Sequence, residues 1–175
     1  MSETVTESGW RVPKWVSTLV IGRRPKRTLI RLVFLLVGSV VIFKFVLLPI
    51  RVEGASMLPT YRERGVNFVN RLAYRTHGPR RGDVVAIRYA GEKIMLMKRV
   101  IGLPGETVSF RDGKVFVNGS PLDEPYVKLP TNWNLPQEMV GPNQYYVVGD
   151  NRSMRESDHV KGRAERKRIV GRVLL

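Results

Sequence analysis

The feature that most constrains this chain is an apolar segment near its N-terminus. Residues 29–50 read LIRLVFLLVGSVVIFKFVLLPI, about 22 residues. An α-helix of that length is what is needed to cross the roughly 30 Å hydrocarbon layer of a membrane. Arg31 and Lys44 interrupt the segment, each about one turn from an end, where a long side chain can reach the headgroups. We therefore predict a transmembrane anchor over residues 28–49.

Two other interpretations of this segment are weaker. A cleaved signal peptide would have a shorter apolar run followed by an A-x-A site, which is not found here. A buried core helix would exclude the two cations. Basic residues precede the segment, so the positive-inside rule predicts a cytoplasmic basic tail over residues 1–27 and an extracytoplasmic domain over residues 50–175. These basic residues are Arg11, Lys14, Arg23, Arg24, Lys26 and Arg27.

Composition narrows the chemistry and the partners. The chain has no cysteine and only two histidines, so thiol nucleophiles, disulfides and Cys-bound zinc are excluded. Little remains for a histidine-based triad or metal site, and we expect no metal and no cofactor. A net charge of +15 favours an anionic partner. Beside an apolar anchor that partner is a phospholipid surface rather than nucleic acid, although a basic surface without a specific partner is equally compatible. We expect a monomer.

Beyond Pro49 the pattern changes to short β-rich runs separated by Gly, Pro, Asn and Asp. Asp112-Gly113 is a two-residue hairpin turn signal, and residues 122–142 are predicted to form a long surface excursion. The predicted fold is an all-β catalytic domain with one N-terminal transmembrane helix. Its expected strands are Val66–Asn70, Asp83–Tyr89, Ile94–Ile101, Thr107–Arg111, Lys114–Asn118, Tyr145–Val148 and Ile169–Leu174.

Two residues form a candidate catalytic pair. Ser56 follows the anchor closely, between turn-forming Gly54 and Pro59. Strand alternation places Lys98 on an apolar face, where burial would lower its pKa and leave an amine able to take a proton from a serine. Each residue also has an ordinary interpretation. The serine can be a turn or helix-cap residue, and the lysine can lie at a strand end with its amine in water.

Four boxes in order strengthen the catalytic interpretation. GASMLPT at 54–60, RGDVV at 81–85, KRVIGLPGE at 98–106 and GDNR at 149–152 resemble the successive boxes of the type I signal peptidases. The resemblance implies a β-fold domain and a catalytic dyad of Ser56 and Lys98. It also implies cleavage of exported preproteins after small residues at −1 and −3. The oxyanion would be held by the Ser56 N–H and by the region of Gly54, which lacks the hydroxyl of a serine.

The last box departs from the family pattern. After GDNR the chain reads SMRESDHVKG, so the serine that usually orients the lysine aligns with Arg155, and the usual arginine aligns with His159. A shift by one or two residues would give the orienting role to Ser153 or to Ser157, beside Asp158. We favour Ser157. Asp150 and Arg152 are expected to form a supporting ion pair.

The expected function is a membrane-bound serine endopeptidase of the signal peptidase I type, whose partners are secretory preproteins and the phospholipid membrane. An extended substrate would pair with an exposed strand edge, for which Asp83–Ile87 and the residues before Ser56 are the candidates. The alternatives are a catalytically silent binding module of the same fold and a self-cleaving Ser-Lys regulator. The residues expected to face substrate or membrane are Ile50, Met57, Leu58, Asp83, Val84 and Val85.

Overall fold

A computed structural model describes residues 25–89 and 94–174. The chain divides into two compact units, with the boundary between Ile42 and Phe43. The predicted basic tail, apart from its last residues, lies outside the described residues.

The N-terminal helix α2 (Pro25–Val41) continues into the π-helical turn η1 (Ile42–Val46). Residues Lys26–Val46 form a helical stretch of 21 residues with mean hydropathy 2.4 and none of its apolar window buried. That length and composition are sufficient to cross a membrane. The anchor was expected to continue to Pro49, but Leu47–Pro49 belong to a strand instead. Proline is tolerated there because this strand lies at a sheet edge.

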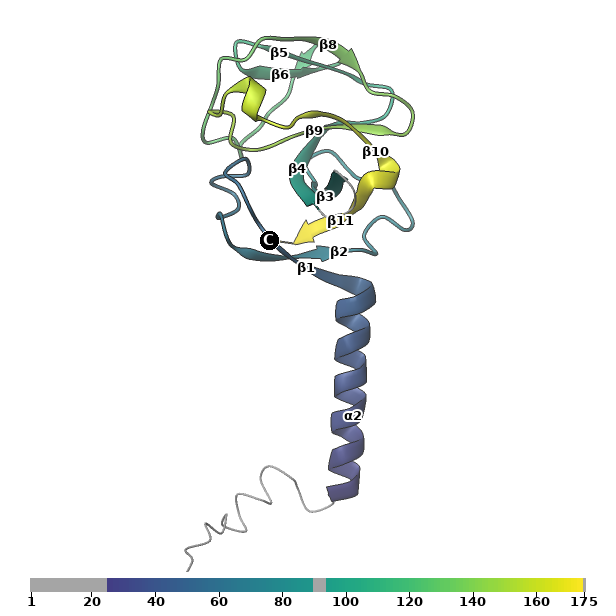
Figure 1. Cartoon of the computed structure of the whole chain (residues 1–175). Helices are drawn as coiled ribbons and strands as arrows, with labels where there is room; N and C mark the ends of the chain where they lie inside the picture. Colours follow the sequence, from purple (N-terminus) through teal and green to yellow (C-terminus); the bar gives the residue numbers. More distant parts are fainter. Residues whose placement is uncertain (1–24, 90–93, 175) are drawn as a thin grey trace, which may run out of the picture. The chain divides into compact units, whose positions relative to one another are not determined.

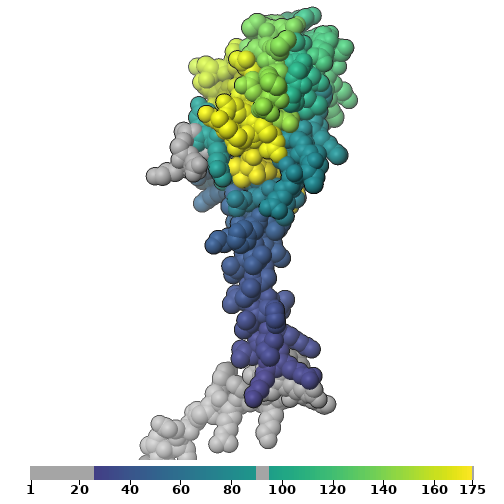
Figure 2. Space-filling model, turned by 90° about the vertical axis from the view of Figure 1, so that its right-hand side faces the viewer, coloured from purple at the N-terminus to yellow at the C-terminus, as the bar shows by residue number. Residues whose placement is uncertain are grey.

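The larger sheet has seven strands in the order β1-β2-β11-β3-β4-β9-β10, and every neighbouring pair is antiparallel (Figure 1). In that order the strands span Leu47–Arg51, Val66–Asn70, Ile169–Leu174, Val84–Tyr89, Ile94–Gly102, Gln144–Val148 and Gly162–Glu165. In Figure 2 the yellow C-terminal residues lie beside teal segments, as expected from the pairing of β11 with both β2 and β3.

The smaller sheet has four strands in the order β7-β6-β5-β8 and lies at the end of the β unit away from β1 and β2 (Figure 1). Its strands span Ser120–Pro121, Lys114–Val117, Thr107–Arg111 and Leu135–Met139. Asp112 and Gly113 join β5 to β6 with φ values of 47° and 76°, which confirms the predicted hairpin turn. A side chain at position 113 would collide with the carbonyl of Thr131, so glycine is required there.

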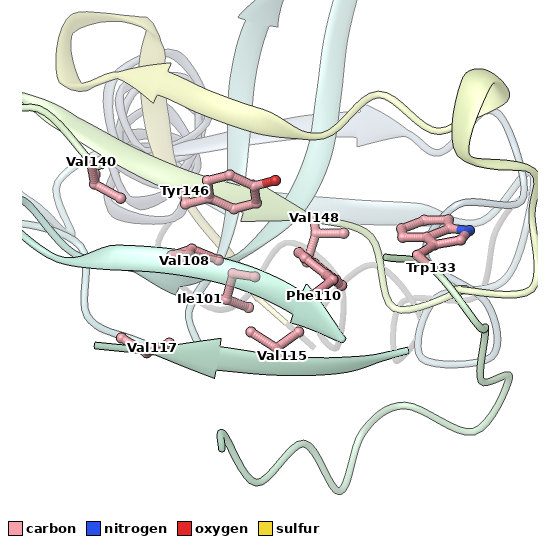
Figure 3. Packing of buried hydrophobic residues seen from close by; sticks show 9 residues of the cluster. All are labelled: Ile101, Val108, Phe110, Val115, Val117, Trp133, Val140, Tyr146 and Val148. Carbon is pink, nitrogen blue, oxygen red and sulfur yellow. The ribbon is translucent and has the colours of Figure 1, made fainter. Parts of the chain in front are cut away.

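Three buried apolar clusters hold these sheets. The first joins the smaller sheet to β4 and β9, with Phe110, Trp133 and Tyr146 packed among valines and Ile101 (Figure 3). The second lies beneath the loop that carries Ser56 and includes Met57, Val84 and Met97. The third covers the opposite part of the larger sheet, around Val85 and Val147. Burial of these side chains is the main stabilising contribution to the domain.

The sequence predicted seven strands correctly to within one residue at each end, and it missed four. Strand β8 lies inside the predicted surface excursion, and β10 lies inside the charged run KGRAERKR at residues 161–168, where no strand was expected. Most residues of β8 are exposed, and β10 is a short run of Gly, Ala and charged residues with one buried position, so neither shows the alternation of apolar and polar residues that identifies a half-buried strand. The all-β fold class itself is confirmed.

Candidate active site

Ser56 lies in the loop that follows β1, where the chain turns sharply. Gly54 adopts a φ of +93°, and the Leu58 N–H donates to the Ala55 carbonyl at 3.1 Å. The loop is held from outside by Asn151, whose backbone N–H donates to the Ser56 carbonyl and whose side-chain amide donates to the Ala55 carbonyl, both at 3.0 Å. The serine is thus fixed by a residue of the GDNR box, 95 positions further along the chain.

Lys98 lies in β4, opposite Val85 of β3, and its side chain is directed at the serine. Its Nζ donates to Ser56 Oγ at 2.7 Å, although the side chain is only 3% exposed. Burial lowers the pKa of Lys98 to about 8, and the negative charge of Asp150 opposes that lowering in part. About one tenth of the lysine is therefore neutral at pH 7, compared with less than a thousandth for an ordinary lysine, and the neutral form is the one that a general base needs.

Asp150 is fully buried and neutralised by Arg99, the residue next to the lysine. Arg99 donates to both carboxylate oxygens, at 2.8 and 2.5 Å, and Thr60 Oγ1 donates to Oδ2 at 2.6 Å. The Arg99 guanidinium also lies 3.9 Å from the centre of the Tyr126 ring. These contacts join three of the four boxes into one buried polar network, which fixes the strand that carries Lys98.

The expected ion pair between Asp150 and Arg152 is wrong. Arg152 is buried and pairs with Glu124, with its guanidinium nitrogens 2.5 and 3.3 Å from the carboxylate oxygens. Its Nε donates to the Gly149 carbonyl at 2.7 Å. The chain bends and turns through residues 150–152, so the two side chains reach different partners. Both residues remain structural supports of the loop that holds Ser56.

Ser157, the residue favoured to orient the lysine, is exposed in the 3₁₀ turn η2 (Glu156–Asp158) and donates to Asp158 at 3.1 Å. Ser153 donates to Asn151 at 2.7 Å, and Arg155 is exposed. Within the part of the chain that the structure describes, none of these residues is in contact with Lys98. Asp158 is likewise exposed. The preference for Ser157 is therefore wrong.

His159 occupies the buried position near the dyad instead. It is 3% exposed, and its ring packs edge-on against Trp133 with centroids 5.0 Å apart. Burial, followed by the charges of Lys98, Arg152 and Lys161, lowers the pKa of His159 to about 3, so the ring is neutral at physiological pH. Neither ring nitrogen has a partner in good hydrogen-bond geometry, although the Val160 backbone lies close enough to oppose the lowering slightly.

Gly149 allows this arrangement. A Cβ atom there would lie 2.1 Å from the Ser56 carbonyl oxygen and 2.8 Å from His159 Nε2. Only a residue without a side chain lets the serine loop and the imidazole approach this closely.

A groove of about 380 Å³ extends from Ser56 between two strand segments. One side is formed by β1 and the loop after it, including Ile50 and Gly54, and the other by Met95–Met97 of β4. Strand β1 pairs only with β2, and β4 pairs with β9 only from Arg99 onward. Two strand edges therefore border the same groove, a geometry that suits an extended peptide.

The expected substrate and membrane-facing residues fall into two groups. Ile50 and Met57 line the groove. Met57 is only 1% exposed and belongs to the second apolar cluster, so it does not face a membrane. Leu58 is half-buried. Asp83, Val84 and Val85 are buried, and β3 is paired on both sides by β11 and β4. The expectation of a substrate edge at Asp83–Ile87 is therefore wrong.

Sequence reasoning missed Arg99, Thr60 and Glu124, which hold the network, and the groove wall Met95–Met97. Arg99 and Thr60 lie inside boxes that were recognised, so their position could have identified them as site residues. Nothing in the sequence around Glu124 pointed to such a role. Among the described residues, no group of three or more His, Cys, Asp or Glu side chains lies close enough to bind a metal ion.

Comparison with known proteins points to one family. The family described as "Signal peptidase, peptidase S26" matches residues 26–175. Signal peptidase I of Leptolyngbya laminosa is 35% identical over 71% of this chain and 65% of its own length. Signal peptidase IB of Staphylococcus aureus is 32% identical over 78% and 82%. A crystal structure of a signal peptidase I from Enterococcus faecalis is 30% identical, covers 55% of this chain and 97% of its own, and has a TM-score of 0.44.

These matches show a family of membrane-associated peptidases, and the chain belongs to it: it is a member of the signal peptidase family S26. The curated relatives that it matches include probable signal peptidase I-2 of Synechocystis, 32% identical over 85% of this chain. The chain spans 65% of the Leptolyngbya protein and 70% of the Synechocystis protein, about two thirds of their lengths.

Proposed function

We propose that this chain is a membrane-tethered serine endopeptidase that removes signal peptides from exported preproteins. The observation that carries the proposal is the 2.7 Å contact between Ser56 Oγ and a buried lysine whose pKa is lowered to about 8. A buried lysine without a paired carboxylate is costly to keep charged, and a fold gains from keeping it mainly when the neutral amine is used. Family membership supplies the substrate class.

In the proposed mechanism neutral Lys98 takes the Ser56 proton as the hydroxyl attacks the scissile carbonyl. The Ser56 N–H and the backbone near Gly54 hold the oxyanion. The protonated lysine then donates to the leaving amine, and water, deprotonated by the same lysine, hydrolyses the acyl-enzyme. No step needs a metal or a cofactor.

We assign His159 the role of a positioning residue for the lysine. The ring lies close enough to Lys98 for the lysine charge to lower the pKa of His159. The neutral ring fills buried space without adding a second charge beside the lysine. An arginine in the same place would need its own carboxylate, as Arg99 and Arg152 have. The neutral imidazole thus helps to keep water away from Lys98, so that burial continues to lower the lysine pKa.

Specificity for small residues at −1 and −3 is attributed to the groove of Ile50, Met57 and Met97. Bulky apolar side chains from both strands border it, so a substrate paired with their edges would have room for small side chains only. The apolar helix Lys26–Val46 would anchor the enzyme, and the basic tail places its N-terminus in the cytoplasm and the catalytic unit outside. We expect it to act as a monomer without nucleic acid.

The irregular last box leaves one main alternative, a catalytically silent binding module that would keep the fold but not the reaction. The self-cleaving regulator is disfavoured by the apolar anchor, and the same test addresses it. A self-cleaving regulator would cut its own chain and ignore preproteins in trans.

The test is cleavage of a preprotein with Ala at −3 and −1 by the purified full chain in detergent. We compare the parent with Ser56→Ala, Lys98→Ala and the control Lys114→Ala, an exposed residue of β6 in the smaller sheet. Cleavage after the −1 Ala by the parent and control, lost in both dyad variants, supports the proposal. Cleavage that survives either dyad substitution contradicts the mechanism. An intact preprotein with the parent supports a silent module, and fragments of the enzyme alone support self-cleavage.

A further inference from the structure

A second cavity, of about 210 Å³, also opens beside the dyad. Lys98 lines this cavity, Ser56 lines the first groove, and Leu96 lines both. Because Lys98 Nζ lies 2.7 Å from Ser56 Oγ, each space borders one member of the hydrogen-bonded pair. An extended chain bound across the dyad would therefore occupy one space before the scissile bond and the other after it.

The two spaces differ in charge. The charged residues that line the first groove are Arg51 and Glu53, one of each sign. Apart from Lys98, the charged residues that line the second cavity are all basic: Arg88, Lys161, Arg163 and Arg168.

Acidic neighbours outside the lining offset part of this charge. Lys161 pairs with Glu156 at 3.1 Å, and Arg163 pairs with Glu138 at 3.4 Å, where both side chains are exposed to water. Glu165 pairs with Lys167 and also interacts with Arg168. The Arg163–Glu138 and Lys167–Glu165 pairs are exposed at both partners and are therefore weak, whereas the Lys161 side chain is only 14% exposed. A bound carboxylate can therefore compete most readily for Arg163 and Arg168.

The reaction determines which end of the substrate each space receives. In the proposed mechanism the nitrogen of the scissile bond leaves with a proton from Lys98, so it must lie beside Nζ when the bond breaks. The residues that follow this nitrogen then continue into the space that Lys98 lines. The residues before the bond pair with the strand edges beside Ser56.

We propose that the second cavity binds the first residues of the mature protein and that its basic lining favours acidic side chains at +1 and +2. This inference rests on the proposed function. It adds a preference on the mature side of the cleavage site, separate from the requirement for small residues at −1 and −3.

The test uses three peptides that share Ala at −3 and −1 and differ only at +1 and +2, with Glu, Gln or Lys at both positions. The purified full chain in uncharged detergent is assayed at low and high salt. We expect kcat/KM for the Glu peptide to exceed that for the Gln peptide by about fivefold, with the Lys peptide slower still, and salt to reduce the differences. Equal values for all three peptides would overturn the inference. Cleavage of the Gln peptide after the −1 Ala would still support the proposed function, whereas failure to cleave any peptide would contradict that function first.

Variants locate the preference. The double substitution Arg163→Gln with Arg168→Gln should bring the Glu-to-Gln ratio of kcat/KM close to one. Lys114→Gln removes a charge in the smaller sheet and should leave the ratio as in the parent. If the double variant keeps the full ratio, the basic lining does not contact the residues at +1 and +2 and the inference is wrong.

Discussion

Lys98 and Arg99 are adjacent in β4, yet their surroundings are opposite in kind. The lysine is buried next to a serine hydroxyl and a neutral imidazole, without a carboxylate in contact, and its pKa is lowered to about 8. The arginine donates two hydrogen bonds to the buried carboxylate of Asp150 and a third to the Gly82 carbonyl. Since successive strand residues face opposite sides, one step along the chain separates a reactive cation from a structural one.

The comparison shows how the domain can hold an uncharged lysine close to a charged network. The Asp150 carboxylate is committed to Arg99 and Thr60, so it opposes the lowering of the Lys98 pKa only in part. In a second buried pair, the Glu124 carboxylate is bound to Arg152, the last residue of the GDNR box. Both carboxylates are paired with an arginine, and among the described residues Lys98 has no carboxylate within salt-bridge distance.

The largest expected effect is on preprotein cleavage, when Lys98 rather than Arg99 is replaced. Lys98→Met keeps the length and burial of the side chain but removes the base, so kcat/KM should fall by about 10³-fold or more. The free energy of unfolding should be unchanged or higher, because no charge has to be buried. Preprotein cleavage and urea unfolding in detergent measure both. A variant that loses stability together with activity would show that the lysine is structural.

Arg99→Met should give the reverse pattern in stability. It leaves the Asp150 carboxylate buried without its ion pair, at a cost of about 3–5 kcal/mol in the free energy of unfolding. Urea unfolding of the parent and variant measures this loss. Adding Asp150→Leu to the same chain should restore much of it, since no buried charge would remain. An Arg99→Met protein as stable as the parent would contradict the role assigned to this pair.

The pH dependence of the parent tests the lysine directly. Because only the neutral amine can accept the serine proton, kcat/KM should rise with pH up to the lowered pKa of about 8 and then level off. Below that value it should fall about tenfold for each pH unit. The rate profile of a peptide without titrating groups measures this. A profile that is flat from pH 6 to 9 would rule out Lys98 as the base.

The smallest effect concerns His159. Its pKa is lowered to about 3 in the folded chain, so between that value and the ordinary 6.5 the unfolded state binds the extra proton. Its contribution is therefore fully present above pH 6.5 and is lost as the pH falls toward 3. His159→Leu should reduce the pH dependence of the free energy of unfolding in that window by about 1 kcal/mol per unit. Urea unfolding at pH 5 and 7 measures it, with His77→Leu, an exposed histidine, as control. Parallel curves for parent and variant would contradict a buried neutral ring.

Much of the local structure could be predicted because it depends on neighbours in sequence. The length and apolarity of residues 29–50 indicated a helix that could span a membrane, and alternation located strands such as Thr107–Arg111. Strands β8 and β10 were not predicted because neither shows a clear alternation of apolar and polar residues. Ser56 and Lys98 were named through the boxes around them, and the structure places them in contact.

The sequence by itself determined the elements whose causes are local: the apolar helix, the Asp112-Gly113 turn and the regularly alternating strands. It could not determine partners that meet across long stretches of chain. Lys98 and Ser56 are 42 residues apart, Arg99 and Asp150 are 51 apart, and Arg152 reaches Glu124 rather than the aspartate two positions away. Which cation meets which carboxylate, and which lysine meets none, depends on strand pairing and burial, and only the tertiary structure decides these.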